Sequence, residues 1–354
     1  MTHAHELDIG PLSWVRGEID EALERASEAI GKATDDDDPQ THFQFAQAHL
    51  HQVRGALSVV GLDGASQFAD TLDQFVGAMA RGEVAADESG AGLAQRACST
   101  LANYLGEVVG GGGDQPLRLF AVYRELARAS GRGEVSAADM FFPDLERRLP
   151  RRRLSGAPPP GSDALAARLR ATRAALERGL LAWLREPANP EGASTMRDAA
   201  IALEAMQTGP VANTLWRVAQ AFFDALAHGD LPASEMRIRQ ICSALVKEVR
   251  VQSGGSRRMP ERLMRDLLFE IGQAPVRTDV QRAVRERWEL DAWWTDPGAA
   301  VADIPLGPLL RELRSEIATA KLDWDAFSAG QGASIHDFDT RIAHIASESA
   351  RLGR

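Results

Sequence analysis

The sequence predicts an all-α protein built from tandem antiparallel helical bundles, and three observations lead to this fold class. Aromatic residues make up only 6% of the 354 residues and there are two tyrosines, so β-strands have little to build with. Apolar residues recur at alternating spacings of three and four, which is the period of an amphipathic helix. Turn and linker signals rich in Gly, Pro and Asp separate these stretches, and the chain length allows two or three domains.

The first module begins with a helix expected over residues 12–33, which is followed by an acidic connector at residues 35–38. The core-facing stripe of the second helix is predicted to be Ala46, Leu50, Val53, Leu57 and Val60. An antiparallel third helix follows the turn at residues 62–64, with an apolar face of Ala65, Phe68, Ala69, Leu72, Phe75, Val76 and Met79. Further helices are expected near residues 89–108 and 116–130, joined by a flexible glycine loop at residues 110–113.

A second stripe on the second helix is expected to lie beside the core and to face solvent. Its members are His51, Arg54, Gly55 and Ser58, at positions i, i+3, i+4 and i+7. A glycine inside a helix costs about 1 kcal/mol relative to alanine, so something should require it there. A bare patch one turn from an exposed imidazole lets the backbone of another protein approach the ring.

Together, these residue types predict a phosphorylatable histidine. His51 supplies a nucleophilic imidazole in water, and Arg54 supplies a cation for the phosphoryl oxygens. On the next helix, Asp73 flanks the apolar face, where it could accept a hydrogen bond from the other ring nitrogen and fix the tautomer. Gln52 and Ser58, together with the glycine, would lie at the docking surface for a partner.

The segment His51-x-x-Arg54-Gly55, followed by Gly61-Leu62, resembles the histidine-containing phosphotransfer (Hpt) domain and the first domain of CheA-type chemotaxis kinases. The family pattern is His-x-x-Lys-Gly, so Arg54 is a departure that keeps the charge but not the compact ammonium group. Asp73 falls where CheA-like domains carry a glutamate beside the histidine, and it is one methylene shorter. The resemblance implies that His51 accepts a phosphoryl group and exchanges it with a response-regulator receiver domain.

Three further segments extend this resemblance: Leu12–Ile19, Gln115–Glu125 and Met140–Leu145. They resemble the N-terminal region of the large ChpA/PilL-type hybrid chemosensory kinases of type IV pilus systems, an arrangement that FimL-type scaffold proteins share. The resemblance extends over essentially the whole chain and is strongest before residue 150. It implies a two-component, chemotaxis-like phosphorelay that controls type IV pili and twitching motility, with a histidine kinase core, a receiver and other chemosensory or pilus regulatory proteins as partners.

The sequence predicts a domain boundary after residue 146. The first Hpt-like bundle is expected over residues 1–146, and residues 147–162 form a linker that is first basic and then rich in Pro and Gly. Residues 163–297 repeat the first module, because Phe222-Phe223 correspond to Phe75-Val76 at a spacing of 147. In that register the residues that replace the phosphoacceptor motif are Asp198, Ile201 and Ala202. The second domain is therefore expected to be a degenerate Hpt-like bundle with a mainly structural role.

Residues 304–354 are expected to form the first helices of an incomplete third module, since Leu313–Ile317 echoes Val15–Ile19. His344 in this module has neither the cation nor the glycine, so we expect no phosphoacceptor there. Members of the family continue into further repeats, a kinase core and a receiver. We therefore expect the chain either to be the beginning of a longer polypeptide or to pack its last hairpin on the second module.

Composition and patterning exclude several function classes. A net charge of -10 argues against general nucleic-acid binding, which needs a basic surface. The sequence shows no signal peptide at the N-terminus and no apolar run long enough to span a membrane. Cys98 and Cys242 are far apart and suit a reducing cytoplasm. His49 points to a different side of its helix from His51, so the pair predicts no metal site, and no cofactor is expected.

Two functions remain open from the sequence. The chain has neither an ATP-binding kinase region nor a receiver, so it is at most a phosphoryl carrier or part of a longer histidine kinase. The first hypothesis is a phosphoryl relay and scaffold module, and the alternative is a non-catalytic scaffold in which His51 is a relic. The relay requires that His51 and Arg54 be exposed and not covered by residues 89–108 or 110–113. An unrelated helical enzyme would need converging acids or metal ligands, and none occurs at helical spacing.

Overall fold

The computed structural model describes residues 9–34, 39–133, 135–150, 162–207, 209–232, 235–253 and 258–294, and isolated positions between 316 and 342. Within these residues every regular element is an α-helix or a 3-10 helix, which confirms the all-α prediction. The chain forms two compact units, one of Met1–Val135 with Ala299–Arg354 and the other of Ser136–Gly298.

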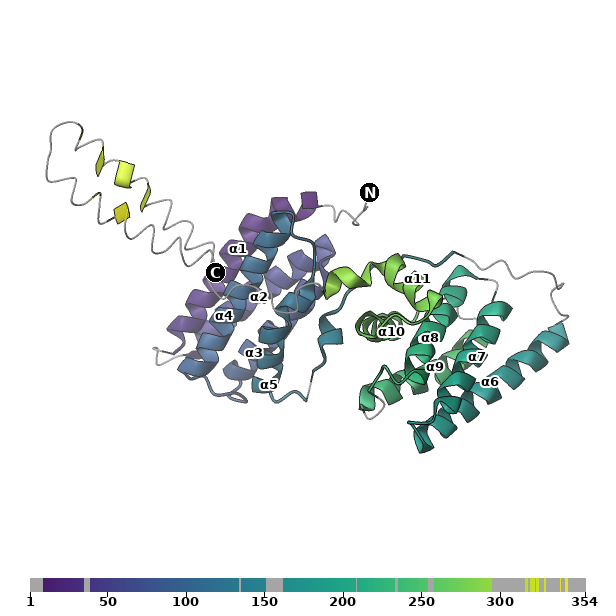
Figure 1. Cartoon of the computed structure of the whole chain (residues 1–354). Helices are drawn as coiled ribbons and strands as arrows, with labels where there is room; N and C mark the ends of the chain where they lie inside the picture. The colour runs from purple at the N-terminus through teal and green to yellow at the C-terminus, as the bar shows by residue number, and fades with distance from the viewer. Residues whose placement is uncertain are drawn as a thin grey trace. The chain divides into compact units, whose positions relative to one another are not determined.

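The first unit is an antiparallel bundle of α1 (Ile9–Lys32), α2 (Pro39–Val60), α3 (Asp63–Ala80) and α4 (Glu88–Val109) (Figure 1). Helix α1 packs against both α2 and α4, and α2 packs against α3. The short helices η1 (Pro116–Leu119) and α5 (Phe120–Ala129) cover α3 and α4. Among the described helices, α1 and α3 are the main neighbours of α2.

The apolar stripes predicted for α2 and α3 form the centre of this bundle. Ala46, Leu50, Val53 and Leu57 are fully buried, as is the whole apolar face expected for α3. Val60, expected in the core, is half-buried instead, because α2 ends there. The chain turns at Gly61, whose φ of 82° is in the left-handed region that favours glycine. Leu62 follows it into the core with no exposed surface, so the Gly-Leu pair closes the α2–α3 hairpin.

The second unit contains η2 (Ala137–Met140), α6 (Ser162–Arg185), α7 (Pro190–Met206), α8 (Pro210–Ala227), α9 (Met236–Ser253), α10 (Glu261–Gln273), α11 (Asp279–Trp288) and η3 (Leu290–Trp293). Helix α8 is in contact with α7, α10 and α11, and every residue from Asn213 to Leu226 is buried. It is therefore a central helix rather than an amphipathic one with a solvent face.

The boundary between the two units lies after Val135, not after residue 146 as the sequence predicted. Phe141 is fully buried among the aromatic rings of the second unit, with centroids 4.8 Å from Trp293 and 5.6 Å from Phe269. Arg217 Nη1 donates to the carbonyl oxygen of Pro150 at 2.6 Å, which holds the end of this segment on α8. Residues 136–150 therefore belong to the second unit, because the ring of Phe141 is buried there and the carbonyl of Pro150 is bound there.

The remaining linker, residues 151–161, lies outside the described residues, and so does most of the expected third module at 304–354. Among its described positions, Arg341 pairs with Glu316 at 2.9 Å and with Asp323 at 3.0 Å. The third module therefore stays a prediction.

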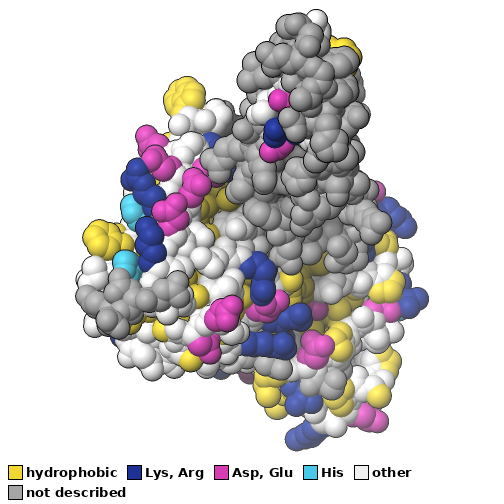
Figure 2. Space-filling view, turned by 90° about the vertical axis from the view of Figure 1, so that its left-hand side faces the viewer, with side chains coloured by type: hydrophobic (Ala, Val, Ile, Leu, Met, Phe, Trp, Pro, Cys, Tyr) yellow, Lys and Arg dark blue, Asp and Glu magenta, His cyan; other side chains and the backbone are white. Residues whose placement is uncertain are grey.

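Two surface properties bear on function. On the face shown in Figure 2, Lys and Arg side chains lie among Asp and Glu side chains, and the described residues there show no large area of one charge. A basic surface of the kind that nucleic acids require is thus not seen on that face. Among the described helices, we find none that combines the length and the apolar character needed to cross a bilayer.

Candidate functional site

His51 lies in the middle of α2, outside the buried stripe, and 67% of its side chain is exposed. Gly55, four residues after His51, is also exposed, and a Cβ atom placed on it would meet no heavy atom within 4 Å. Helix α4 packs on α1 and α3, and the glycine loop after it turns back on Glu107. Neither segment covers the histidine, so within the described residues its approach from solvent is open.

Arg54 lies one turn along α2 from His51 and reaches two groups at once. Its Nη2 atom is 3.1 Å from His51 Nε2 and 3.2 Å from Nδ1. Its Nη1 atom donates to Asp70 Oδ1 on α3 at 2.5 Å. The guanidinium group therefore lies between the imidazole and a carboxylate. An anionic group attached to the ring would have this cation beside it.

Asp73 approaches the other side of the ring from α3. Its Oδ2 atom is 3.7 Å from His51 Nδ1, which is within ion-pairing range but longer than a hydrogen bond. Burial raises the pKa of the Asp73 carboxyl group above its usual value, while the charges of His51 and Arg54 and a hydrogen bond from Gln47 act in the opposite direction. Nδ1 is therefore the ring nitrogen that pairs with the carboxylate, whereas Arg54 Nη2 lies within hydrogen-bond distance of both ring nitrogens.

The structure brings together the three residues that the sequence predicted as chemically active, namely His51, Arg54 and Asp73. Gln52, Gly55 and Ser58, predicted for docking, are all exposed on the same side of α2. Their roles stay predictions, because geometry alone does not test them. In the second unit, the apolar residues of α8 lie in the interior, namely Leu215, Trp216, Val218, Phe222, Phe223 and Leu226.

The sequence analysis did not identify the residues that bind Arg54 and Asp73 and hold them beside His51. Asp70 pairs with Arg54, and Gln74 Nε2 donates to Asp70 Oδ2 at 2.6 Å. Gln47, one turn before His51, stabilises the charged form of Asp73 by a hydrogen bond. The amide nitrogen of Gln47 would lie only 2.6 Å from a Cβ atom added to Gly77, so the glycine leaves room for this amide. The spacing of Asp70 three residues before Asp73 was the available signal, since it puts both carboxylates on one side of α3.

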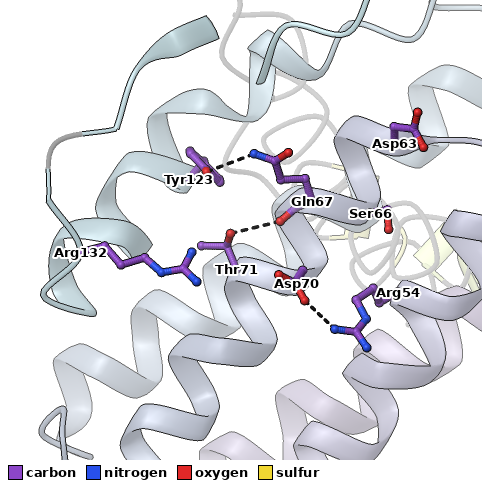
Figure 3. Close-up of a pocket in the computed structure, with 8 residues that line it drawn as sticks. All are labelled: Arg54, Asp63, Ser66, Gln67, Asp70, Thr71, Tyr123 and Arg132. Atoms are coloured by element: carbon purple, nitrogen blue, oxygen red, sulfur yellow. Dashed lines mark hydrogen bonds and ion pairs between the residues drawn. The ribbon is translucent and has the colours of Figure 1, made fainter. Parts of the chain in front are cut away.

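A cleft of about 450 Å³ adjoins the site on its α3 side (Figure 3). It is lined by Arg54, Asp63, Ser66, Gln67, Asp70, Thr71, Tyr123 and Arg132. Figure 3 shows Arg54 and Arg132 on opposite sides of Asp70 and Thr71, and Gln67 donating to the Tyr123 hydroxyl at 3.2 Å. Within the described part of the chain, no three His, Cys, Asp or Glu side chains converge to hold a metal ion.

The second unit has no histidine at the corresponding place. Asp198, exposed on α7, stands there in the predicted register and pairs with Arg197 at 2.8 Å. Ile201 and Ala202 occupy the positions that correspond to the cation and the glycine. In that register, the described residues of the second unit place no imidazole at the position that corresponds to His51.

Comparison with known families agrees with this division. Residues 12–109 match the Hpt domain family, and residues 161–300 match the family of the FimL scaffold protein second domain. The first match contains the whole of helices α1 to α4 apart from the first residues of α1, and therefore His51 and its neighbours. No curated protein and no solved structure matches the chain.

Proposed function

Because the chain joins an Hpt domain to a FimL-type second domain, we propose that it is a histidine phosphotransfer and scaffold module of a cytoplasmic chemosensory phosphorelay that controls type IV pili. The observation that carries the phosphotransfer proposal is the exposed imidazole of His51, with a guanidinium group 3.1 Å from Nε2 and a carboxylate 3.7 Å from Nδ1. The pilus assignment rests on the resemblance to the ChpA/PilL and FimL families. The free, buried thiols of Cys98 and Cys242 are consistent with a reducing compartment.

In the proposed transfer, Nε2 of His51 is the nucleophile. Its lone pair attacks the phosphorus atom of the donor, the Nε2–P bond forms, and the bond from phosphorus to the leaving oxygen breaks with its electron pair. Nδ1 keeps its proton and directs it at Asp73, which stabilises the positive charge on the ring. Arg54 offsets the negative charge of the phosphoryl oxygens. Reversal of these steps passes the group to the aspartate of a receiver.

The exposed side of α2 is the proposed docking surface for that receiver. Among the exposed residues of α2, none is Asp, Glu, Lys or Arg, so the half-buried Arg54 is the only charged residue that this helix contributes beside His51, and the neighbouring carboxylates belong to Asp70 and Asp73 of α3. Phe45 and Val59, with 59% and 90% of their surface exposed, lie toward opposite ends of the helix. Gln52, Gly55 and Ser58 lie between them. Such a surface fits an apolar helix of a partner better than a charged one.

Phosphoryl transfer to the purified chain tests the relay directly. The donor is an autophosphorylated kinase core or a phosphorylated receiver, and the product is acid-labile, base-stable label on the chain. The label should disappear in His51→Gln and persist in His49→Gln, a matched change two residues away on the same helix. A wild-type chain that stays unlabelled, with a donor shown to label another Hpt domain, would refute the relay.

A non-catalytic scaffold is the second candidate, and one observation favours it. The second unit has Asp198 in place of a phosphoacceptor and matches a family described as a scaffold. In this case the chain would bind the kinase or receiver with the same affinity whether residue 51 is histidine or glutamine. Binding measured by calorimetry for both proteins separates this function from the relay.

A further inference from the structure

We propose that Asp70 is a positioning residue. It holds the guanidinium group of Arg54 so that Arg54 can contact a phosphoryl group on His51 while it stays bound to Asp70. The inference rests on the proposed phosphotransfer function and deepens it. It also assigns a reason for arginine at a position where the Hpt family has lysine.

The first observation is that Arg54 uses two different nitrogens for its two neighbours. Nη1 is bound to Asp70 Oδ1 at 2.5 Å, and Nη2 is 3.1 Å from His51 Nε2 (Figure 3 shows the ion pair). A phosphoryl group on Nε2 would place its oxygens beside Nη2, while Nη1 remains on the carboxylate. The cation is thus in place before the negative charge arrives, which is the condition for electrostatic preorganisation.

Asp70 is itself held in position. Its second oxygen, Oδ2, accepts a hydrogen bond from Gln74 Nε2 at 2.6 Å, one turn further along α3. Both oxygens are therefore engaged, and the side chain is only 35% exposed. A carboxylate fixed on a helix that packs against α2 gives Arg54 an anchor from a second element of the bundle.

The shape of the cation explains why arginine fits this arrangement. The guanidinium group presents donors in a rigid, planar fork, so one end can stay on a carboxylate while the other meets a phosphoryl oxygen. A lysine ammonium is a single point charge at the end of a flexible chain. At this position it would have to divide its contacts between Asp70 and the phosphoryl group from one atom.

A rival explanation makes the opposite prediction. If Asp70 only weakened the charge of Arg54, removing it would strengthen the attraction for phosphoryl oxygens and transfer would become faster. If Asp70 positions Arg54, removing it leaves a mobile cation and transfer becomes slower, by about tenfold or more for a misplaced charged group. The direction of the change decides between the two.

The test uses phosphoramidate, a small donor that needs no docking surface. The phosphoryl group moves to His51 Nε2 as its bond to nitrogen breaks and ammonia leaves, and ³¹P NMR of the full chain follows the product. We expect Asp70→Asn to slow labelling about tenfold. Asp63→Asn, which removes the same charge from an exposed residue that lines the same cleft, should label at the wild-type rate.

A double-mutant cycle excludes a merely structural role. In an Arg54→Lys background, Asp70→Asn should cause no further loss, because the fork that Asp70 holds is already absent. A rate for Asp70→Asn equal to or above that of the wild type would overturn the proposal, and so would an equal loss in the lysine background. A wild-type chain that phosphoramidate does not label would overturn the phosphotransfer function itself, an outcome distinct from either of these.

Discussion

Replacing Gly55 by alanine should make the first unit more stable and the relay slower. Gly55 is inside α2, and an added Cβ atom would meet nothing within 4 Å. Alanine favours a helix over glycine by about 1 kcal/mol, so Gly55→Ala should raise the free energy of unfolding by up to about that amount. For a domain of about 100 residues this corresponds to a rise in Tm of about 4–8 °C, measurable by calorimetry.

The same methyl group should hinder a partner that approaches His51. An extra methylene forced into a close-packed contact costs about 1–3 kcal/mol, so transfer from a phosphorylated receiver should fall by about 5- to 150-fold. Labelling by phosphoramidate should be unchanged, because the small donor does not dock on α2. Gly92→Ala is the matched control, since Gly92 is exposed on α4 and a Cβ there also meets nothing within 4 Å.

The control should gain the same stability with no loss of receiver-dependent transfer. A Gly55→Ala protein that is less stable than the wild type would refute the structural part of the reasoning. Equal slowing with the receiver and with phosphoramidate would refute the docking part, because it would place the effect on the chemistry of His51 rather than on access to it.

Three further predictions concern buried polar groups. Glu204→Ala should lower the free energy of unfolding of the second unit by about 3–5 kcal/mol, measured in urea, because it leaves the buried Arg217 without a counter-charge. An unchanged free energy of unfolding would contradict the importance of this ion pair. Gly77→Ala should displace the Gln47 amide and raise the pKa of Asp73 further, as carboxyl NMR titration would show, whereas an unchanged pKa would mean that the amide contributes nothing. Burial raises the pKa of Glu270 from 4.5 to about 7, so folding favours its protonated form. The resulting stability is fully present below pH 4.5 and is lost as pH rises through about 7, by up to about 3 kcal/mol, and Glu270→Gln should remove this dependence in denaturation curves recorded across that range.

The parts of the site that sequence could predict are those set by helical geometry. His51 and Arg54 share a side of α2 because they are three residues apart, and the short turn at Gly61 fixes α3 antiparallel to it. Asp73 then falls level with His51. Asp70 escaped prediction because its importance depends on the rotamer of Arg54, which only the packed bundle determines.

The second unit shows where periodicity misleads. Helix α8 carries Arg217, Gln220 and Asp224 at positions i, i+3 and i+7, a spacing that is typical of the solvent-facing side of an amphipathic helix. In the structure all three are buried, with Arg217 paired with Glu204 on α7 and Asp224 accepting a hydrogen bond from Thr278 at 3.2 Å. These partners lie on α7 and at the N-terminal cap of α11, so no local pattern could indicate that the polar side would be covered.

The burial of Phe141 also determines how the chain can be divided. A fragment that begins at residue 161, where the family match begins, would lack Phe141 and the carbonyl of Pro150. It would leave an open hydrophobic slot against Phe269 and a guanidinium group with one fewer acceptor, and such a fragment should aggregate. For expression, truncation mapping or domain exchange, the second unit must therefore be taken from about Ser136 onward.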